Sequence, residues 1–161
     1  MKHSTCKHAL ADLPAFPKRR AVVEDWLVLP AAAKGAGYRS ADGKDLILDN
    51  GLIRRTFRLS PNAACIAFDN LATGESILRA VKPEATLTVN GTDYPVGGLT
   101  GLPNRAYLRR EWIDAMTAAP NAFRCIGFAL GKTAARFPWK PTGGVQAPWP
   151  PPGVSLALRF T

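Results

Sequence analysis

Two Asn-Gly pairs, each placed between strand-like runs, constrain the fold of this chain more than any other feature of its sequence. The first pair begins at Asn50 and divides the stretch Asp45–Leu59. The second begins at Asn90 and divides Ala85–Val96. Both residues of such a pair tolerate the positive φ angles of a type I′ turn, which joins two antiparallel strands through a two-residue loop. The sequence therefore predicts two β-hairpins and an antiparallel β protein.

Alternation of apolar and polar residues extends the strand prediction along the chain. The clearest case is Val154–Thr161, where every second residue is a large apolar one, as expected for a strand with one buried face. In Phe123–Leu130 the same alternation places Ile126, Phe128 and Leu130 on one face. Further strands are expected at 22–30, 38–40, 53–59, 64–69 and 76–80.

Arg55 breaks the alternation in the second arm of the first hairpin. Its position in the strand matches that of Ile53 and Phe57, which are expected to face inward. An inward-pointing charge is costly unless it is paired or reaches water at an edge. If Arg55 points inward, we expect its partner to be Glu75 or Glu84.

One helix is expected, beginning at Asn104 and ending before Pro120. Arg110 and Asp114 are four residues apart and would pair on its surface. An apolar stripe with the same spacing is formed by Leu108, Trp112 and Met116. The expected fold class is therefore an all-β antiparallel β-sandwich with one short helix.

Length and composition indicate one domain with a short basic tail. A chain of 161 residues, 47% apolar and 20% charged, has the composition of an ordinary globular domain. We expect a flexible tail over residues 1–20, which hold five basic residues and one acidic residue, and a β-sandwich domain over residues 21–161. Domains seldom end on an unprotected apolar strand. The strand expected at Val154–Thr161 therefore predicts that this chain is a fragment of a longer protein, which continues beyond residue 161.

The net charge of +9 raises the question of nucleic-acid or membrane binding. Outside the tail, however, the basic residues are scattered, which favours a solvated basic surface and neither of these partners. No apolar run approaches the length of about 18 residues that a membrane span needs. Residues 1–20 also lack the apolar region of a secretory signal, which predicts a cytoplasmic protein if the first residue is the genuine start.

The usual catalytic and metal-binding combinations are not expected in this chain. Both histidines, His3 and His8, lie in the tail, and the three cysteines are far apart. Glu111 and Asp114 could approach each other on the helix, but carboxylates at this spacing are usually solvated or paired with arginine. We therefore expect no catalytic residue, no metal site and no cofactor.

Tryptophans in and near loops are the candidate binding residues. Trp112 lies in the expected helix, whereas Trp139 and Trp149 lie in residues 137–153, a proline-rich stretch that we expect to be an extended loop. An indole offers a flat apolar face and one N–H donor, on which a sugar ring can stack. Arg109 and Glu111 would supply polar contacts beside Trp112. Alternatively, each tryptophan fills the core of the sandwich or its open end.

Several segments give the chain a family resemblance over about residues 22–161. They include LDNGLIRRTF, TGESILRA, KPEATLTVNG, YPVGGLTG and the terminal FPWKP and PWPPPGVSLALRF. The chain resembles the N-terminal β-supersandwich region of bacterial multidomain proteins related to α-galactosidases, which shares the fold of galactose mutarotases. The resemblance implies a non-catalytic or substrate-rim domain of an exported carbohydrate-active protein, with a catalytic domain downstream as its partner.

Two other functions compete with carbohydrate binding by an accessory domain. The first is a structural or protein-interaction module that binds no sugar and whose basic surface meets an acidic partner. The second is a mutarotase-type enzyme, which would open a sugar ring by acid–base catalysis. Because that chemistry normally uses histidine acids and both histidines lie in the tail, the enzyme is the least favoured of the three.

Overall fold

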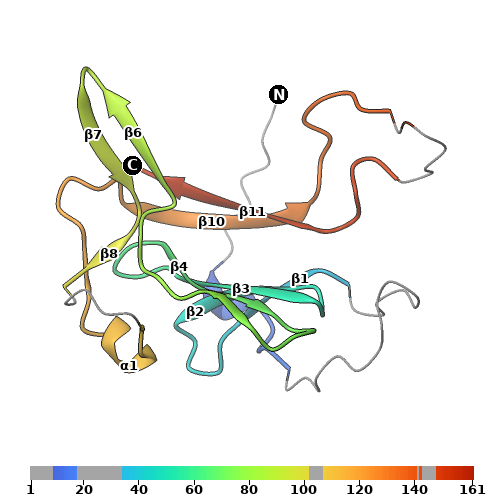
Figure 1. Ribbon diagram of the computed structural model, residues 1–161, viewed down its shortest axis with the longest axis horizontal. Helices are drawn as coiled ribbons and strands as arrows, with labels where there is room; N and C mark the ends of the chain where they lie inside the picture. Colours follow the sequence, from blue (N-terminus) through green and yellow to red (C-terminus); the bar gives the residue numbers. More distant parts are fainter. Residues whose placement is uncertain (1–8, 18–33, 102–106, 141, 143–147) are drawn as a thin grey trace.

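The computed structural model describes residues 9–17, 34–101, 107–140, 142 and 148–161. These residues form a 3-10 helix at Leu10–Asp12, one α-helix, α1, at Arg110–Ile113, and eleven strands (Figure 1). The strands are β1 Ala36–Arg39, β2 Asp45–Asp49, β3 Ile53–Arg58, β4 Ala64–Asn70, β5 Ser76–Leu78, β6 Ala85–Val89, β7 Thr92–Val96, β8 Leu99–Thr100, β9 Thr117–Ala118, β10 Cys125–Lys132 and β11 Val154–Phe160. The strand predicted at 22–30 lies outside the described residues.

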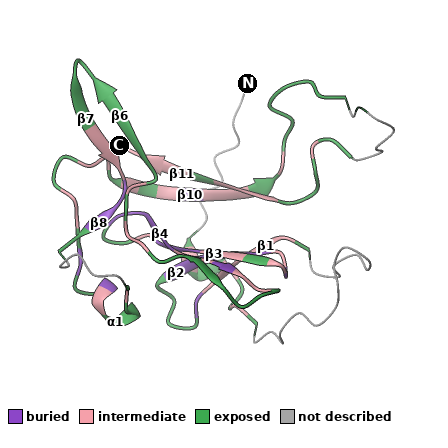
Figure 2. Ribbon diagram, viewed as in Figure 1, coloured by how far each residue is buried: buried purple, intermediate pink, exposed green. Residues whose placement is uncertain are grey.

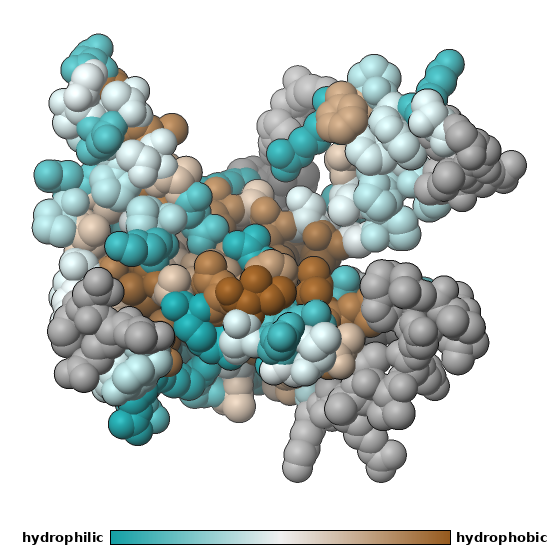
Figure 3. Space-filling model, viewed as in Figure 1, coloured by the Kyte–Doolittle hydropathy of each residue, from teal (hydrophilic) through white to brown (hydrophobic). Residues whose placement is uncertain are grey.

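Two antiparallel sheets pack face to face. The larger sheet has the order β1-β2-β3-β4-β5, and the smaller is the pair β10-β11. Leu46, Phe57 and Cys65 of the larger sheet meet Phe128 of β10 in a buried cluster. Figure 3 shows apolar side chains gathered in a band between the two sheets. The prediction of an all-β antiparallel sandwich is confirmed.

Both predicted hairpins form, but they use different turns. In the β6–β7 hairpin Asn90 has a φ of 51° and Gly91 a φ of 78°, as a type I′ turn requires. In the β2–β3 hairpin only Gly51 has a positive φ, and the side-chain oxygen of Asn50 accepts hydrogen bonds from the backbone N–H groups of Leu52 and Ile53. The type I′ prediction is wrong for this turn, because the Asn50 side chain satisfies the backbone of a longer loop.

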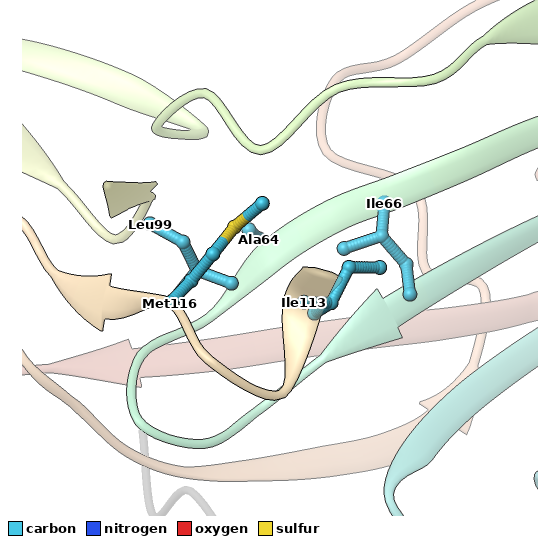
Figure 4. Packing of buried hydrophobic residues seen from close by; sticks show 5 residues of the cluster. All are labelled: Ala64, Ile66, Leu99, Ile113 and Met116. Carbon is cyan, nitrogen blue, oxygen red and sulfur yellow. The ribbon is translucent and has the colours of Figure 1, made fainter. Parts of the chain in front are cut away.

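The outer face of the larger sheet is covered by α1 and the strands β8 and β9. Ala64 and Ile66 of β4 pack there against Leu99, Ile113 and Met116, all of which are buried (Figure 4). Partly buried apolar side chains packed on this cluster are Val81, Leu108 and Trp112. The residues of the predicted apolar stripe therefore do share one cluster.

The predicted helix is much shorter in the structure. It ends at Ile113, and its predicted start, Asn104, lies outside the described residues. Arg110 and Asp114 do not pair with each other: Arg110 binds Asp42 and Asp45, whereas Asp114 binds Lys44 and Arg58. Tertiary ion pairs with the β1–β2 region have replaced the expected contact along the helix surface.

A bulge changes the face of one residue that was predicted to be buried. The pairing of β10 with β11 shifts register between Cys125 and Gly127. Phe128 is buried as expected, but Ile126 is 55% exposed. The strict alternation that the sequence predicted fails there because a bulge adds one residue to one strand and reverses the side-chain direction.

Residues 9–17 were expected in a flexible tail, but they contact the sandwich. Leu10 and Leu13 pack against the core between the sheets. The backbone N–H of Phe16 donates to the carbonyl of Arg39 at 2.9 Å, and the N–H of Arg39 donates to the carbonyl of Pro14 at 3.0 Å. This segment extends the edge of the larger sheet beside β1.

Arg55 pairs with Glu84, one of its two predicted partners. The closest nitrogen–oxygen distance is 3.6 Å, and the Arg55 side chain is 43% exposed. Its guanidinium also lies 4.8 Å from the ring centroid of Phe57 and 5.8 Å from that of Phe68. Aromatic stacking and one carboxylate thus stabilise a cation at the inner face of the sheet.

A buried ion pair connects β2 to β3 and to α1. The Nε of Arg58 donates to Asp45 at 2.5 Å, and both side chains are almost fully buried. Arg110 donates to the other Asp45 oxygen at 2.6 Å, and Asp114 accepts a second hydrogen bond from Arg58 at 2.7 Å. Two arginines thus bind both oxygens of a fully buried carboxylate.

Replacing Arg58 with Met tests this ion pair. We expect Arg58→Met to lower the free energy of unfolding by about 3–5 kcal/mol, because it leaves the Asp45 charge buried without its main partner. Arg109→Met is the control, since it removes only the exposed pair of Arg109 with Glu111 and should cost less than about 1 kcal/mol. Urea denaturation measures both variants. An equal loss in the free energy of unfolding for the two would contradict the role assigned to the Arg58–Asp45 ion pair.

Acid should weaken the fold through its paired carboxylates. Hydrogen bonds from Ser40 and Arg110 lower the pKa of Asp42, and those from Lys44 and Arg58 lower the pKa of Asp114. Burial raises the pKa of Asp69, but bonds from Arg79 and Ser76 outweigh it and the net shift is downward. The unfolded chain therefore binds more protons, and this stability is present above the ordinary Asp pKa of about 4 and lost below it.

We expect the urea midpoint to change little near neutral pH and to fall as the pH drops below about 4. Asp42→Asn removes one of these carboxylates and should give a shallower acid slope than the unaltered protein. A midpoint that holds steady down to pH values of about 2, or identical slopes for the two proteins, would disprove the linkage.

Candidate functional site

Three aromatic side chains meet on the loop that connects β10 to β11. Phe137 and Trp139 lie after β10, and Trp149 lies before β11. The ring centroid of Trp149 is 5.1 Å from that of Phe137 and 5.2 Å from that of Trp139. We call these three residues the aromatic cluster. The loop extends away from the two sheets (Figure 1).

Hydrogen bonds across the loop hold the two halves of the aromatic cluster together. The indole N–H of Trp149 donates to the backbone carbonyl of Phe137 at 3.1 Å. At the base of the loop, the hydroxyl of Thr133 donates to the carbonyl of Pro151 at 2.5 Å. Proline restricts φ and removes a backbone donor, which explains why the described parts of this segment join no sheet ladder.

The aromatic cluster is not part of the core. Phe137 is 57% exposed, Trp139 42% and Trp149 37%, and the described parts of the loop are coloured as exposed in Figure 2. Trp139 and Trp149 therefore do not fill the core of the sandwich. Three neighbouring rings held open to solvent can receive a flat, partly apolar ligand face.

A cavity of about 240 Å³ lies where the loop returns to the sandwich. Its walls combine the β2–β3 turn region with Pro152, Gly153 and Val154 at the start of β11. Polar groups on the turn side come from Asp49, Asn50 and Arg55. Since three residues span at most about 11 Å, Pro152 lies within that distance of Trp149. The cavity therefore lies near the base of the loop that carries the aromatic cluster, but none of the three cluster residues lines it.

The other predicted binding residues lie elsewhere in the fold. Trp112 belongs to α1, packs against the cluster beneath that helix, and stacks on Tyr107 with ring centroids 5.4 Å apart. Arg109 and Glu111 form an exposed ion pair at 3.4 Å. Figure 1 places α1 and the β10–β11 loop at opposite ends of the molecule. The five predicted residues therefore do not form one site.

A second cavity, which the sequence did not predict, lies on the outer face of the larger sheet beside α1. It has a volume of about 330 Å³, and its charged walls are Arg54, Arg79, Arg110 and Asp69. Asp69 pairs with Arg79 at 2.7 Å and with Arg54 at 3.1 Å. Because these arginines already bind carboxylates of the chain, we interpret the cavity as part of the structural ion network.

The described residues were compared with the catalytic and metal-binding combinations considered above. Within them no group of three His, Cys, Asp or Glu side chains is arranged to hold a metal ion. Both histidines lie outside the described residues. Glu111 and Asp114, considered above as a carboxylate pair, each bind a cation instead, Glu111 through Arg109 and Asp114 through Lys44 and Arg58.

Comparison with known proteins gives no family for this chain. It matches no protein-family model, and no curated protein or solved structure is significantly similar to it. Among the described residues, no helix has both the length and the apolar character needed to cross a membrane. The candidate site therefore rests on the geometry of the aromatic cluster and the cavity beside it.

Two tryptophan substitutions should separate the candidate site from the core. We expect Trp112→Ala to lower the free energy of unfolding by about 1–3 kcal/mol, because Trp112 is half-buried against the α1 cluster. Trp139→Ala should cost less than about 1 kcal/mol, because its ring lies on an exposed loop. Urea denaturation followed by circular dichroism measures both, and an equal cost for the two would show that the loop is part of the core.

Proposed function

We propose that this chain is a non-catalytic β-sandwich domain that binds carbohydrate through the aromatic cluster of Phe137, Trp139 and Trp149. The observation that carries the proposal is the exposure of three rings whose centroids lie 5.1–5.2 Å from the central one, Trp149. Large exposed aromatics that contact each other outside the core are a common mark of a binding surface.

The chemistry of the cluster suits a sugar ring. One face of many pyranose rings presents C–H groups, which pack on an indole, while the hydroxyl rim needs hydrogen-bonding partners. A ligand that extends from the rings to the cavity at the base of the loop would find such partners in Asp49, Asn50 and Arg55. The hydrogen bond from Trp149 to Phe137 holds the cluster in place before a ligand arrives, which reduces the entropy lost on binding.

The resemblance to domains of α-galactosidase-related proteins supports the same function and adds a partner. It implies that the sandwich packs beside a catalytic domain of the same exported polypeptide and contributes to its substrate rim. The aromatic cluster would then present a polysaccharide to that catalytic domain. Mutarotase-type chemistry is less favoured, because the described part of the chain contains no histidine.

A protein-interaction module is the second candidate, and one observation favours it. The β6–β7 hairpin projects from the sandwich (Figure 1), and Leu87 and Val89 on one of its faces are each 49% exposed. Tyr94 lies opposite Leu87 on the same face and contacts Phe123, with ring centroids 6.1 Å apart. This apolar face is a natural contact for another domain.

Titration calorimetry against galactosides and plant polysaccharides tests the proposed function. We expect binding to at least one polysaccharide, and Trp139→Ala and Trp149→Ala should each weaken it more than about tenfold, because hot-spot aromatics commonly contribute over about 1.4 kcal/mol. Tyr107→Ala is the matched control, since Tyr107 is an aromatic residue with 59% exposure outside the loop.

If titration with every carbohydrate in the panel gives no heat of binding, the proposed function is ruled out. The protein-interaction module is then the favoured function. Binding that Tyr107→Ala weakens as much as Trp139→Ala would move the site away from the β10–β11 loop. Unchanged circular dichroism in all three variants establishes that a loss of binding is not a loss of fold.

A further inference from the structure

Acidic and basic residues are divided unevenly along this chain. All twelve Asp and Glu residues lie at or before Asp114. From Ala115 to the end the chain has no acidic residue, but it has five basic ones, Arg124, Lys132, Arg136, Lys140 and Arg159. More than half of the net charge of +9 therefore comes from this last part of the sequence.

The uniformly basic part of the sequence includes β10, β11 and the loop that carries the aromatic cluster. Arg136 directly precedes Phe137, and Lys140 directly follows Trp139. Neighbouring Cα atoms are about 3.8 Å apart, so the backbone places both basic residues next to the positions that carry Phe137 and Trp139. Both side chains are exposed, which leaves their charges available to a ligand on the cluster.

Most described arginines in the rest of the fold are paired. In or next to the larger sheet and α1, the arginines Arg54, Arg58, Arg79 and Arg110 each bind an aspartate of the chain. In contrast, none of the five basic residues after Asp114 forms an ion pair with a described carboxylate. Like charges without counter-charges create a local positive potential that attracts anions.

We infer that the carbohydrate bound by the aromatic cluster is anionic, a polysaccharide with carboxylate or sulfate groups along its chain. This inference rests on the proposed function, because the rings would stack on the sugar while Arg136 and Lys140 bind its acid groups. Arginine and lysine both form charge-assisted hydrogen bonds with such groups. A neutral sugar would gain hydrogen bonds from these cations, but it would lack the attraction between opposite charges that an acid group adds.

Single-stranded nucleic acid is the other polyanion that stacks on aromatic side chains. Two features favour a charged polysaccharide. The three rings form one compact cluster in which Phe137 and Trp139 are tilted by 44° and 46° against Trp149, instead of the row of separate rings on which successive bases stack. The cations also occur singly along the sequence, without the clustered basic stripe typical of nucleic-acid binding.

The test compares polymers that differ only in charge. Calorimetry of the full chain with polygalacturonate and with its methyl ester covers the carboxylate arm, and dextran sulfate with dextran covers the sulfate arm. We expect at least one anionic polymer to bind more tightly than its neutral partner, with an affinity that falls as salt rises from about 0.05 to about 0.5 M. The arm that shows this difference identifies the acid group.

A charge variant locates the effect. Arg136→Gln/Lys140→Gln should weaken binding of the anionic polymer by roughly 1.5- to 5-fold for each charge removed, while binding of the neutral polymer stays unchanged. The matched control is Arg109→Gln/Lys82→Gln, which also removes one arginine and one lysine at exposed positions outside the loop. It should bind as the unaltered chain does.

The outcomes separate the two proposals. Equal, Trp139-dependent affinity for charged and neutral polymers would keep the proposed function and overturn the inference. Binding of an anionic polymer that Trp139→Ala leaves unchanged would overturn both, because the cluster would then take no part. Tighter binding of single-stranded DNA than of any polysaccharide would also overturn both and assign the loop to nucleic acid.

Discussion

The packing on the outer face of the larger sheet depends on the carboxylate of Asp45. This carboxylate is fully buried, and such a charge is tolerated only if it is paired. Arg58 faces it directly across the β2–β3 pair, and Arg110 reaches it from α1. The Asp45 carboxylate therefore fixes both the register of β2 with β3 and the position of α1. A slip of one residue would send Arg58 to the other face of the sheet, and a displaced α1 would withdraw Arg110.

The sequence predicted the strands well because strand signals are local. Alternation and Asn-Gly turns are visible in a few residues, and the hairpins around Asn50 and Asn90 followed from them. The length of the helix was overestimated because its charged side chains bind partners elsewhere in the fold. The helical spacing of Arg110 and Asp114 gave no information about Asp45 or Lys44. The exposure of Ile126 could not be predicted either, because a bulge depends on how β10 pairs with β11.

The candidate site was predicted in part. Proline around Trp139 and Trp149 indicated a loop, and both tryptophans do lie on it. Their approach to each other depends on the path of the loop, which no spacing rule gives, and Phe137 was missed for the same reason. From the sequence alone, Trp112 was a binding candidate like Trp139 and Trp149. It differs because α1 presses it against an apolar cluster, and burial of this kind is decided by neighbours far away in the sequence.

The confinement of all Asp and Glu residues to the sequence up to Asp114 makes the two sheets respond differently to pH. Aspartates hold the larger sheet to α1, so acid reaches the scaffold through groups that titrate. β10, β11 and the loop between them contain no Asp or Glu side chain, and guanidinium and ammonium groups as a class keep their protons throughout the acid range. While the scaffold stays folded, a change with pH in the affinity of a ligand held by the rings and these cations alone would therefore report the acid groups of the ligand. Binding curves at several pH values would then act as a titration of the bound molecule.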